Sequence, residues 1–86
     1  MLFWTLYPRQ YCGGIAAAYA VWKRIKKDER VMVIEHVELF ADIQSKASVE
    51  KAQFTPHART WLNQGRWEGD SYELAAAWAA HYEVKL

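Results

Sequence analysis

The spacing of apolar residues predicts helices that are joined by polar or glycine-containing segments. The first predicted helix covers residues 15–27, where an alanine-rich stretch has high intrinsic helix propensity. Apolar side chains recur in it at intervals of three and four residues, so one face is expected to be buried. That face would contain Ile15, Ala18, Tyr19, Trp22 and Ile25.

The second predicted helix runs from about residue 29 to about residue 48, and Asp28 is placed to cap it. Residues 31–34 are rich in β-branched side chains and could pass for a strand, but the three- to four-residue rhythm continues to Ala47 and favours a helix. Its inner stripe would contain Val33, Ile34, Val37, Phe40 and Ala41. Its acidic residues line up on a face expected to be solvent-exposed, and they are Glu35, Glu38 and Asp42.

A last helix is predicted from Ser71 to about Tyr82. Asp70 or Ser71 can cap its N-terminus, and Glu73 stands in the capping-box position. Its buried face would contain Leu74, Ala75, Trp78 and Tyr82.

Residues 54–69, between these two helices, carry the strongest local signals and predict a short helical clip. Thr55 is expected to cap this clip, and Pro56 would take the first helical position, where its missing N–H costs nothing. Gly65 stands where a left-handed C-cap residue is needed. One apolar face of the clip would contain Ala58, Trp61 and Leu62.

These elements predict an all-α fold, a small bundle of three to four helices around one aromatic core. The chain has 86 residues, which fits a single domain over 1–86 that is a fragment or the C-terminal module of a longer protein. Five tryptophans and five tyrosines supply large aromatic side chains for the core. Trp4, in the apolar segment 2–7, is expected to close the bundle against Trp22.

The sequence lacks the motifs expected of a metal site, an enzyme or a membrane-spanning segment. Cys12 and the three histidines (His36, His57 and His81) lack the paired spacing of zinc ligands, so we expect no metal and no cofactor. The chain has no nucleophile elbow and no glycine-rich phosphate loop, so neither an enzyme nor a small-molecule substrate is expected. Apolar runs fall short of the ~20 residues that cross a bilayer, so we expect no membrane partner and a cytoplasmic location in a bacterial host.

Positive charge is concentrated near the end of the first predicted helix, although the net charge of the chain is only +1. The clustered cations are Lys23, Arg24, Lys26, Lys27 and Arg30, and Arg59 and Arg66 could join them if their loops fold over the same side. Such local density is typical of phosphate contacts, and aromatic side chains among the cations could stack on unpaired bases. The alternative is that the cations only complement the dipole of a helix C-terminus and are solvated.

Trp67 lies in a loop between two predicted helices. It could be a lid that covers the core, or it could join Arg66 as an anchor for a protein partner. In a protein-interaction function, the acidic face formed by Glu35, Glu38 and Asp42 would share the docking surface with this loop.

A set of residues along this chain, in the order expected for the family, resembles a module of phage and prophage replication proteins. They are Phe3-Trp4, Tyr7-Pro8, Ala18, Trp22-Lys23, Phe54-Thr55-Pro56-His57 and Thr60-Trp61-Leu62-Asn63-Gln64-Gly65-Arg66-Trp67-Glu68. The resemblance is to the C-terminal domain of a replisome organiser or helicase-loader type protein, which follows a DNA-binding winged helix. It covers most of residues 3–69, whereas Gly13-Gly14 replaces a more basic stretch and the helix from Ser71 extends beyond the pattern.

The resemblance and the basic cluster together predict a non-enzymatic prophage DNA-replication accessory domain. It would bind DNA, help to recruit the replicative helicase or another replisome protein, or do both. The alternative is a structural or protein-interaction helical module that makes no nucleic-acid contact. The choice between single- and double-stranded DNA, the identity of the partner and the oligomeric state all stay open at this stage.

Overall fold

The computed structural model describes residues 1–65 and 67–85 of the chain. Over these residues it contains six α-helices and one 3-10 helix: α1 (Leu2–Leu6), η1 (Arg9–Tyr11), α2 (Ile15–Trp22), α3 (Lys27–Ser45), α4 (Val49–Ala52), α5 (Ala58–Asn63) and α6 (Ser71–Tyr82). The same residues contain no strand, so the predicted all-α class is confirmed.

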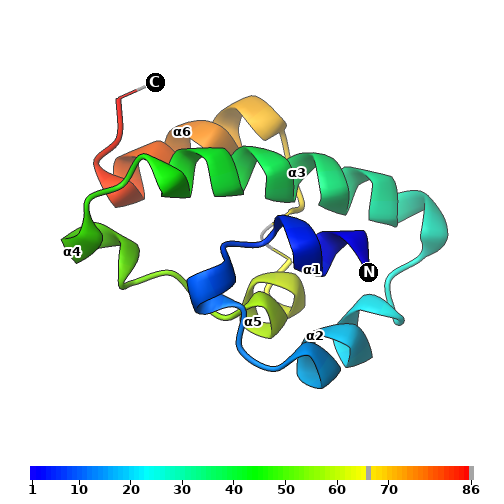
Figure 1. Cartoon of the computed structure of the whole chain (residues 1–86). Coiled ribbons are helices and arrows are strands. Elements are labelled where there is room, and N and C mark those ends of the chain that lie inside the picture. The colour runs from blue at the N-terminus through cyan, green and yellow to red at the C-terminus, as the bar shows by residue number, and fades with distance from the viewer. Residues whose placement is uncertain (66, 86) are drawn as a thin grey trace.

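The long helix α3 divides the molecule into two sides (Figure 1). Helix α6 packs along α3 on one side. Helix α1 packs against α3 on the other side, where α2 and α5 also lie and pack against each other. The connection from α2 into α3 forms a corner at one end of the molecule, and α4 lies at the opposite end.

Trp61 of α5 stands at the centre of a single aromatic core. Its ring lies 5.7 Å from Phe3 of α1, 5.6 Å from Phe40 of α3 and 6.3 Å from Trp78 of α6, measured between ring centroids. Rings at such separations attract each other beyond their apolar burial, by about 0.5–1.5 kcal/mol per pair. One indole from the predicted clip therefore joins four helices, and the predicted aromatic core is confirmed.

The first predicted helix was extended too far, because α2 ends at Trp22 rather than at Lys27. The guanidinium of Arg30 donates hydrogen bonds to the carbonyl oxygens of Trp22 and Lys23, each at 3.3 Å, and lies 5.3 Å from the Trp22 ring. The Trp22 carbonyl also accepts from the N–H of Ile25 at 3.0 Å, in a turn tighter than that of the α-helix. Arg30, a residue of the following helix α3, thus bonds carbonyls at the C-terminal end of α2.

The predicted buried face of α2 is wrong at two positions, since Ile15 and Tyr19 are 53% and 52% exposed. Ala18 is buried as predicted, and Val21, which was not predicted, is the other buried residue of this helix. Helix α5 packs against α2. In an alanine-rich helix every face is weakly apolar, so the spacing of the large residues did not identify the packed side.

The prediction for α3 was closer, although the helix begins two residues earlier and ends three residues earlier than expected. Its N-cap is Lys26, whereas Asp28 lies within the first turn rather than capping it. The predicted stripe is buried at Val33, Val37 and Phe40 and half-buried at Ile34 and Ala41. His36 and Gln44 are also buried, which the apolar pattern did not predict.

Thr55 does not cap the clip helix, contrary to the prediction. Its hydroxyl lies 2.7 Å from the Tyr82 hydroxyl and accepts a hydrogen bond from Gln44 Nε2 at 3.5 Å. The helix begins two residues after Pro56, with His57 as its N-cap. The Tyr7 hydroxyl donates to the Pro56 carbonyl, so this segment is fixed by tertiary contacts rather than by local capping.

Helix α6 has the predicted bounds and the predicted cap. The Asp70 carboxylate accepts hydrogen bonds from the N–H groups of Tyr72 and Glu73, at 2.9 Å and 3.1 Å. At the other end of the sequence, the apolar segment forms α1, and Trp4 is only half-buried. Phe3, not Trp4, stacks on Trp22, with ring centroids 5.8 Å apart.

Candidate nucleic-acid interface

The connection from α2 to α3 presents four exposed cations, which we call the basic corner: Lys23, Arg24, Lys26 and Lys27. Residues 23–30 contain five cations and two carboxylates, so their net charge is +3 while that of the whole chain is +1. The remaining residues are therefore net negative. The cluster predicted from the sequence forms one local patch of positive charge.

Two explanations were offered for these cations, the dipole of a helix C-terminus and contact with phosphate, and their positions on the helices distinguish the two. Lys23 is the C-cap of α2, and Arg24 Nε donates to the carbonyl of Ala20 at 3.2 Å, so both complement the end of that helix. Lys26 and Lys27 instead occupy the N-cap and first position of the 19-residue helix α3. Cations are unfavourable at a helix N-terminus, so the dipole accounts for only half of the basic corner.

Arg30 belongs to the predicted cluster but has a different role. Its guanidinium is half-buried, bonds two carbonyls at the end of α2 and stacks on the Trp22 ring. Arg30 thus holds the shape of the corner, and its predicted nucleic-acid contact stays a prediction.

The basic corner is not neutralised by ion pairs within the described part of the chain. The ion pairs there are Lys46–Asp42 at 3.3 Å and Lys51–Glu83 at 3.4 Å, and both lie outside the corner. All four corner cations are therefore available to an anionic ligand.

Arg59 and Arg66 were predicted to join the basic cluster, and the structure describes only Arg59. Arg59 is exposed on α5, the helix that packs against α2. Arg66 lies outside the described residues, so neither its predicted phosphate contact nor its predicted partner contact is placed.

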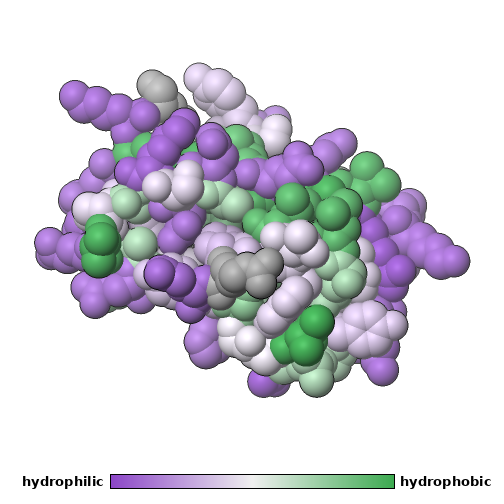
Figure 2. Space-filling view, in the orientation of Figure 1, coloured by the Kyte–Doolittle hydropathy of each residue, from purple (hydrophilic) through white to green (hydrophobic). Residues whose placement is uncertain are grey.

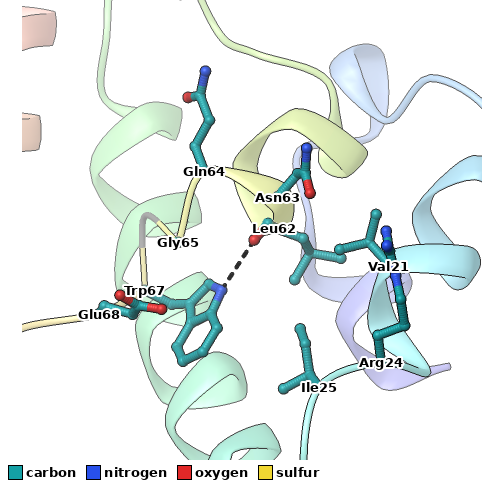
Figure 3. Close-up of a pocket in the computed structure, with 9 residues that line it drawn as sticks. All are labelled: Val21, Arg24, Ile25, Leu62, Asn63, Gln64, Gly65, Trp67 and Glu68. Carbon is teal, nitrogen blue, oxygen red and sulfur yellow. Dashed lines mark hydrogen bonds between the residues drawn. The ribbon is translucent and has the colours of Figure 1, made fainter.

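A pocket of about 340 Å³ opens beside the basic corner, between the end of α2 and the turn after α5 (Figure 3). Figure 3 shows Ile25 and the Trp67 indole facing each other across it, with Leu62 between them. Arg24 belongs both to the basic corner and to the lining of this pocket. The complete lining is Val21, Arg24, Ile25, Leu62, Asn63, Gln64, Gly65, Trp67 and Glu68.

Trp67 forms a wall of the pocket. It is 6% exposed, and its indole N–H donates to the carbonyl of Leu62 at 3.3 Å. Trp67 is therefore buried, as a lid over the core would be, and its role as an anchor for a partner stays a prediction. The indole can still contact a molecule that enters the pocket.

The turn that carries Trp67 depends on Gly65, which has the left-handed conformation predicted for it, with φ of +64°. The N–H of Glu68 donates to the Gly65 carbonyl at 2.9 Å. A Cβ atom at Gly65 would approach the Glu68 carboxylate to 3.0–3.1 Å, which is tighter than usual packing. The glycine therefore allows Glu68 to fold back over the turn at the rim of the pocket.

The acidic face on α3 is exposed as predicted at Glu35, Glu38 and Asp42. Asp42 pairs with Lys46, one turn further along the helix. This face contributes nothing to the lining of the pocket.

The pocket was missed in the sequence because its walls come from two distant segments: residues 21, 24 and 25, and residues 62–65, 67 and 68. The available signals were a glycine at the end of the clip and a tryptophan just beyond it. Neither signal indicates that the turn after α5 meets the end of α2.

Among the described residues, every helix is too short or too polar to span a lipid bilayer. Within the same ranges, no three side chains of His, Cys, Asp or Glu come together as a group that could hold a metal ion.

Comparison with known protein families matches residues 1–65 to the Legionella vir region protein LvrA C-terminal domain. The match includes 65 of the 86 residues, and α1 to α5 with the whole basic corner lie inside it. Trp67, Glu68 and α6 lie beyond it. No curated protein and no solved structure matches the chain.

Proposed function

The chain belongs to the Legionella vir region protein LvrA C-terminal domain family, and we propose that it binds nucleic acid through the basic corner, as a non-enzymatic accessory domain of prophage DNA replication. One observation carries this proposal: Lys26 and Lys27 are exposed, unpaired among the described residues and placed against the dipole of α3. Stability of the fold does not explain cations at these positions. Contact with a polyanionic ligand would explain why Lys26 and Lys27 occupy them.

The replication context of the proposal comes from the resemblance to phage and prophage replication modules. Its most specific part, residues 54–68, includes α5 and the pocket residues from Leu62 to Gly65. This supports a role on DNA beside a replicative helicase or another replisome protein.

The basic corner also sets the expected salt dependence. Each cation that neutralises a phosphate releases condensed counterions, so the logarithm of the affinity falls with the logarithm of the salt concentration by about 0.7–0.9 per phosphate contact. Four contacts give a slope of about −3.

The test is fluorescence anisotropy with labelled single-stranded and duplex oligonucleotides at a low and a high salt concentration. We expect salt-dependent binding by the wild-type chain. Lys23→Glu with Lys27→Glu should abolish it, because both substitutions reverse exposed charges of the corner.

A matched control for this double variant is Lys46→Glu with Lys85→Glu, which changes the net charge equally at two exposed positions outside the corner. The control should keep most of the affinity. Wild-type binding by a folded Lys23→Glu, Lys27→Glu variant would contradict the proposal.

A protein-interaction module without nucleic-acid contact is the second candidate, and a surface feature favours it. Figure 2 shows hydrophobic side chains gathered over α1 and the N-terminal half of α3. Leu2 and Val31 in these elements are 58% and 63% exposed. A pull-down with the replicative helicase tests this function: capture by the wild type but not by a Val31→Glu variant, with no oligonucleotide binding, would support it.

A further inference from the structure

We propose that the pocket beside the basic corner holds one unpaired base of a single-stranded nucleic acid whose phosphates contact the corner. This inference rests on the proposed function, in which the basic corner contacts phosphates. It adds a contact between one base and the pocket that lies between α2 and the turn after α5.

The first argument is position. Arg24 lines the pocket and also belongs to the basic corner, and Lys23 adjoins it in the chain. A strand whose phosphates lie along the corner therefore passes the mouth of the pocket. Only a base that is free of its complementary strand can turn into it.

The second argument is the size of the pocket and the chemistry of the side chains that form its walls. The pocket volume of about 340 Å³ lies at the lower end of the range for small-molecule sites, about 300–1,000 Å³. Aliphatic side chains of Val21, Ile25 and Leu62 and the indole of Trp67 form its apolar walls. Such walls suit one flat heterocyclic ring.

The third argument is the polar rim. Asn63 and Glu68 are exposed and line the pocket, and they offer an amide and a carboxylate. The edge of a base carries donors and acceptors that can pair with both groups. The carboxylate of Glu68 also repels phosphate, so the strand is oriented with its phosphates toward Arg24 and its base toward Glu68.

The indole of Trp67 is held in place for this contact. Its N–H donates to the Leu62 carbonyl, and the residue is 6% exposed while it lines the pocket. Because the wall is already ordered, a base that enters loses little binding free energy to rearrangement of the protein.

The experiment uses three labelled oligonucleotides of about 12 nucleotides, a length within the site sizes of single-strand binders. One is a single strand, one is its duplex, and one is a single strand of abasic sugars with the same number of phosphates. We expect the wild-type chain to bind the abasic strand about tenfold more weakly than the natural strand, as for loss of a stacked base. The duplex should also bind more weakly.

The variant for this test is Ile25→Trp, which fills the pocket and leaves all corner cations in place. It should bind the natural and abasic strands equally, with an unchanged salt slope. The matched control is Val31→Trp, which adds the same side chain at an exposed position on α3. This control should keep the tenfold preference for the natural strand.

A second measurement does not depend on how Ile25→Trp folds. A single strand that carries 2-aminopurine should change its emission when the fluorescent base enters the wild-type pocket beside Trp67. Unchanged emission at saturating protein would overturn the proposal.

The outcomes separate this inference from the proposed function. Equal, salt-dependent binding of natural and abasic strands overturns the base pocket and leaves the function of the basic corner standing. Absence of binding to any oligonucleotide at low salt overturns both. Tight binding of an aspartate-rich peptide with one leucine, lost in Ile25→Trp, would assign the pocket to a protein partner and overturn the base assignment.

Discussion

Two residues of the clip, Trp61 and Gly65, decide different properties of the molecule. Trp61 is fully buried and contacts rings from α1, α3 and α6, so it holds the helices together. Gly65 is at the surface of the same segment and shapes the turn that places Trp67 and Glu68 at the pocket. Substitutions at the two positions should therefore have effects of different size.

Trp61→Ala should lower the free energy of unfolding by about 3–5 kcal/mol, because it leaves a large cavity at the meeting point of four helices. The measurement is urea denaturation followed by circular dichroism. Trp4→Ala is the control, since Trp4 is half-buried and its removal should have a smaller effect. Equal losses in the two variants would contradict a core centred on Trp61.

Gly65→Ala should lower stability by about 1 kcal/mol or more, because its φ is positive and its Cβ would crowd the Glu68 carboxylate. Gly14→Ala is the matched control. Gly14 has φ of −87°, and an added Cβ there meets no described atom within 4 Å. Gly14 is also the N-cap of α2, where alanine is less favourable than glycine, so Gly14→Ala should lower the midpoint of thermal unfolding slightly and Gly65→Ala should lower it more.

At the scale of elements, the turn between α2 and α3 is fixed by a side chain from the helix that follows it. Arg30 bonds the carbonyls of Trp22 and Lys23, eight and seven residues before it. Lysine cannot reproduce this arrangement, because it lacks the planar fork that bonds two carbonyls while stacking on a ring. The geometry of the basic corner thus depends on a residue that does not belong to it.

Arg30→Lys should lower stability by about 1–2 kcal/mol through the lost hydrogen bonds. It should weaken oligonucleotide binding without changing its salt slope, because the Arg30 guanidinium already bonds the carbonyls of Trp22 and Lys23. Lys27→Ala should do the reverse, reducing the slope by about 1 and leaving stability nearly unchanged. Anisotropy titrations across a salt series distinguish the two, and a reduced slope in Arg30→Lys would show that Arg30 contacts phosphate.

The elements that could be predicted are those with local signals. Helix α6 was predicted with its bounds and its cap because Asp70 bonds N–H groups only two and three residues away. The end of α2 depends on Arg30, and the role of Thr55 depends on Tyr82, which is 27 residues further along the chain. The pocket joins two segments about forty residues apart, so no local pattern could indicate it. The basic corner was predictable as a cluster of cations, but its position at a helix N-terminus was not.

At the scale of the whole molecule, the region that matches the family ends before the folded core does. The match ends at residue 65, whereas α6 packs along α3 and supplies Trp78, whose ring lies 5.2 Å from Phe40. The Tyr82 hydroxyl also reaches the buried hydroxyl of Thr55. Helix α6 therefore completes the core of the region that the family model covers.

Removal of residues 71–86 should leave residues 1–70 without cooperative unfolding, because the exposed side of α3 would then carry the apolar surface that α6 covers. Near-ultraviolet circular dichroism, which reports ordered aromatic side chains, should be lost. Removal from residue 85 onward is the control and should preserve the signal, since Lys85 is exposed. A native spectrum from residues 1–70 would show that α6 is dispensable.

The aromatic core extends without interruption to the basic corner. Trp61 stacks on Phe3, Phe3 stacks on Trp22, and the Arg30 guanidinium lies over Trp22, at successive distances of 5.7, 5.8 and 5.3 Å. The Arg30 guanidinium therefore connects the corner to the aromatic core. If this connection restrains the corner, its cations give up less conformational entropy on binding the proposed ligand, and we expect substitutions among the buried rings to weaken that binding.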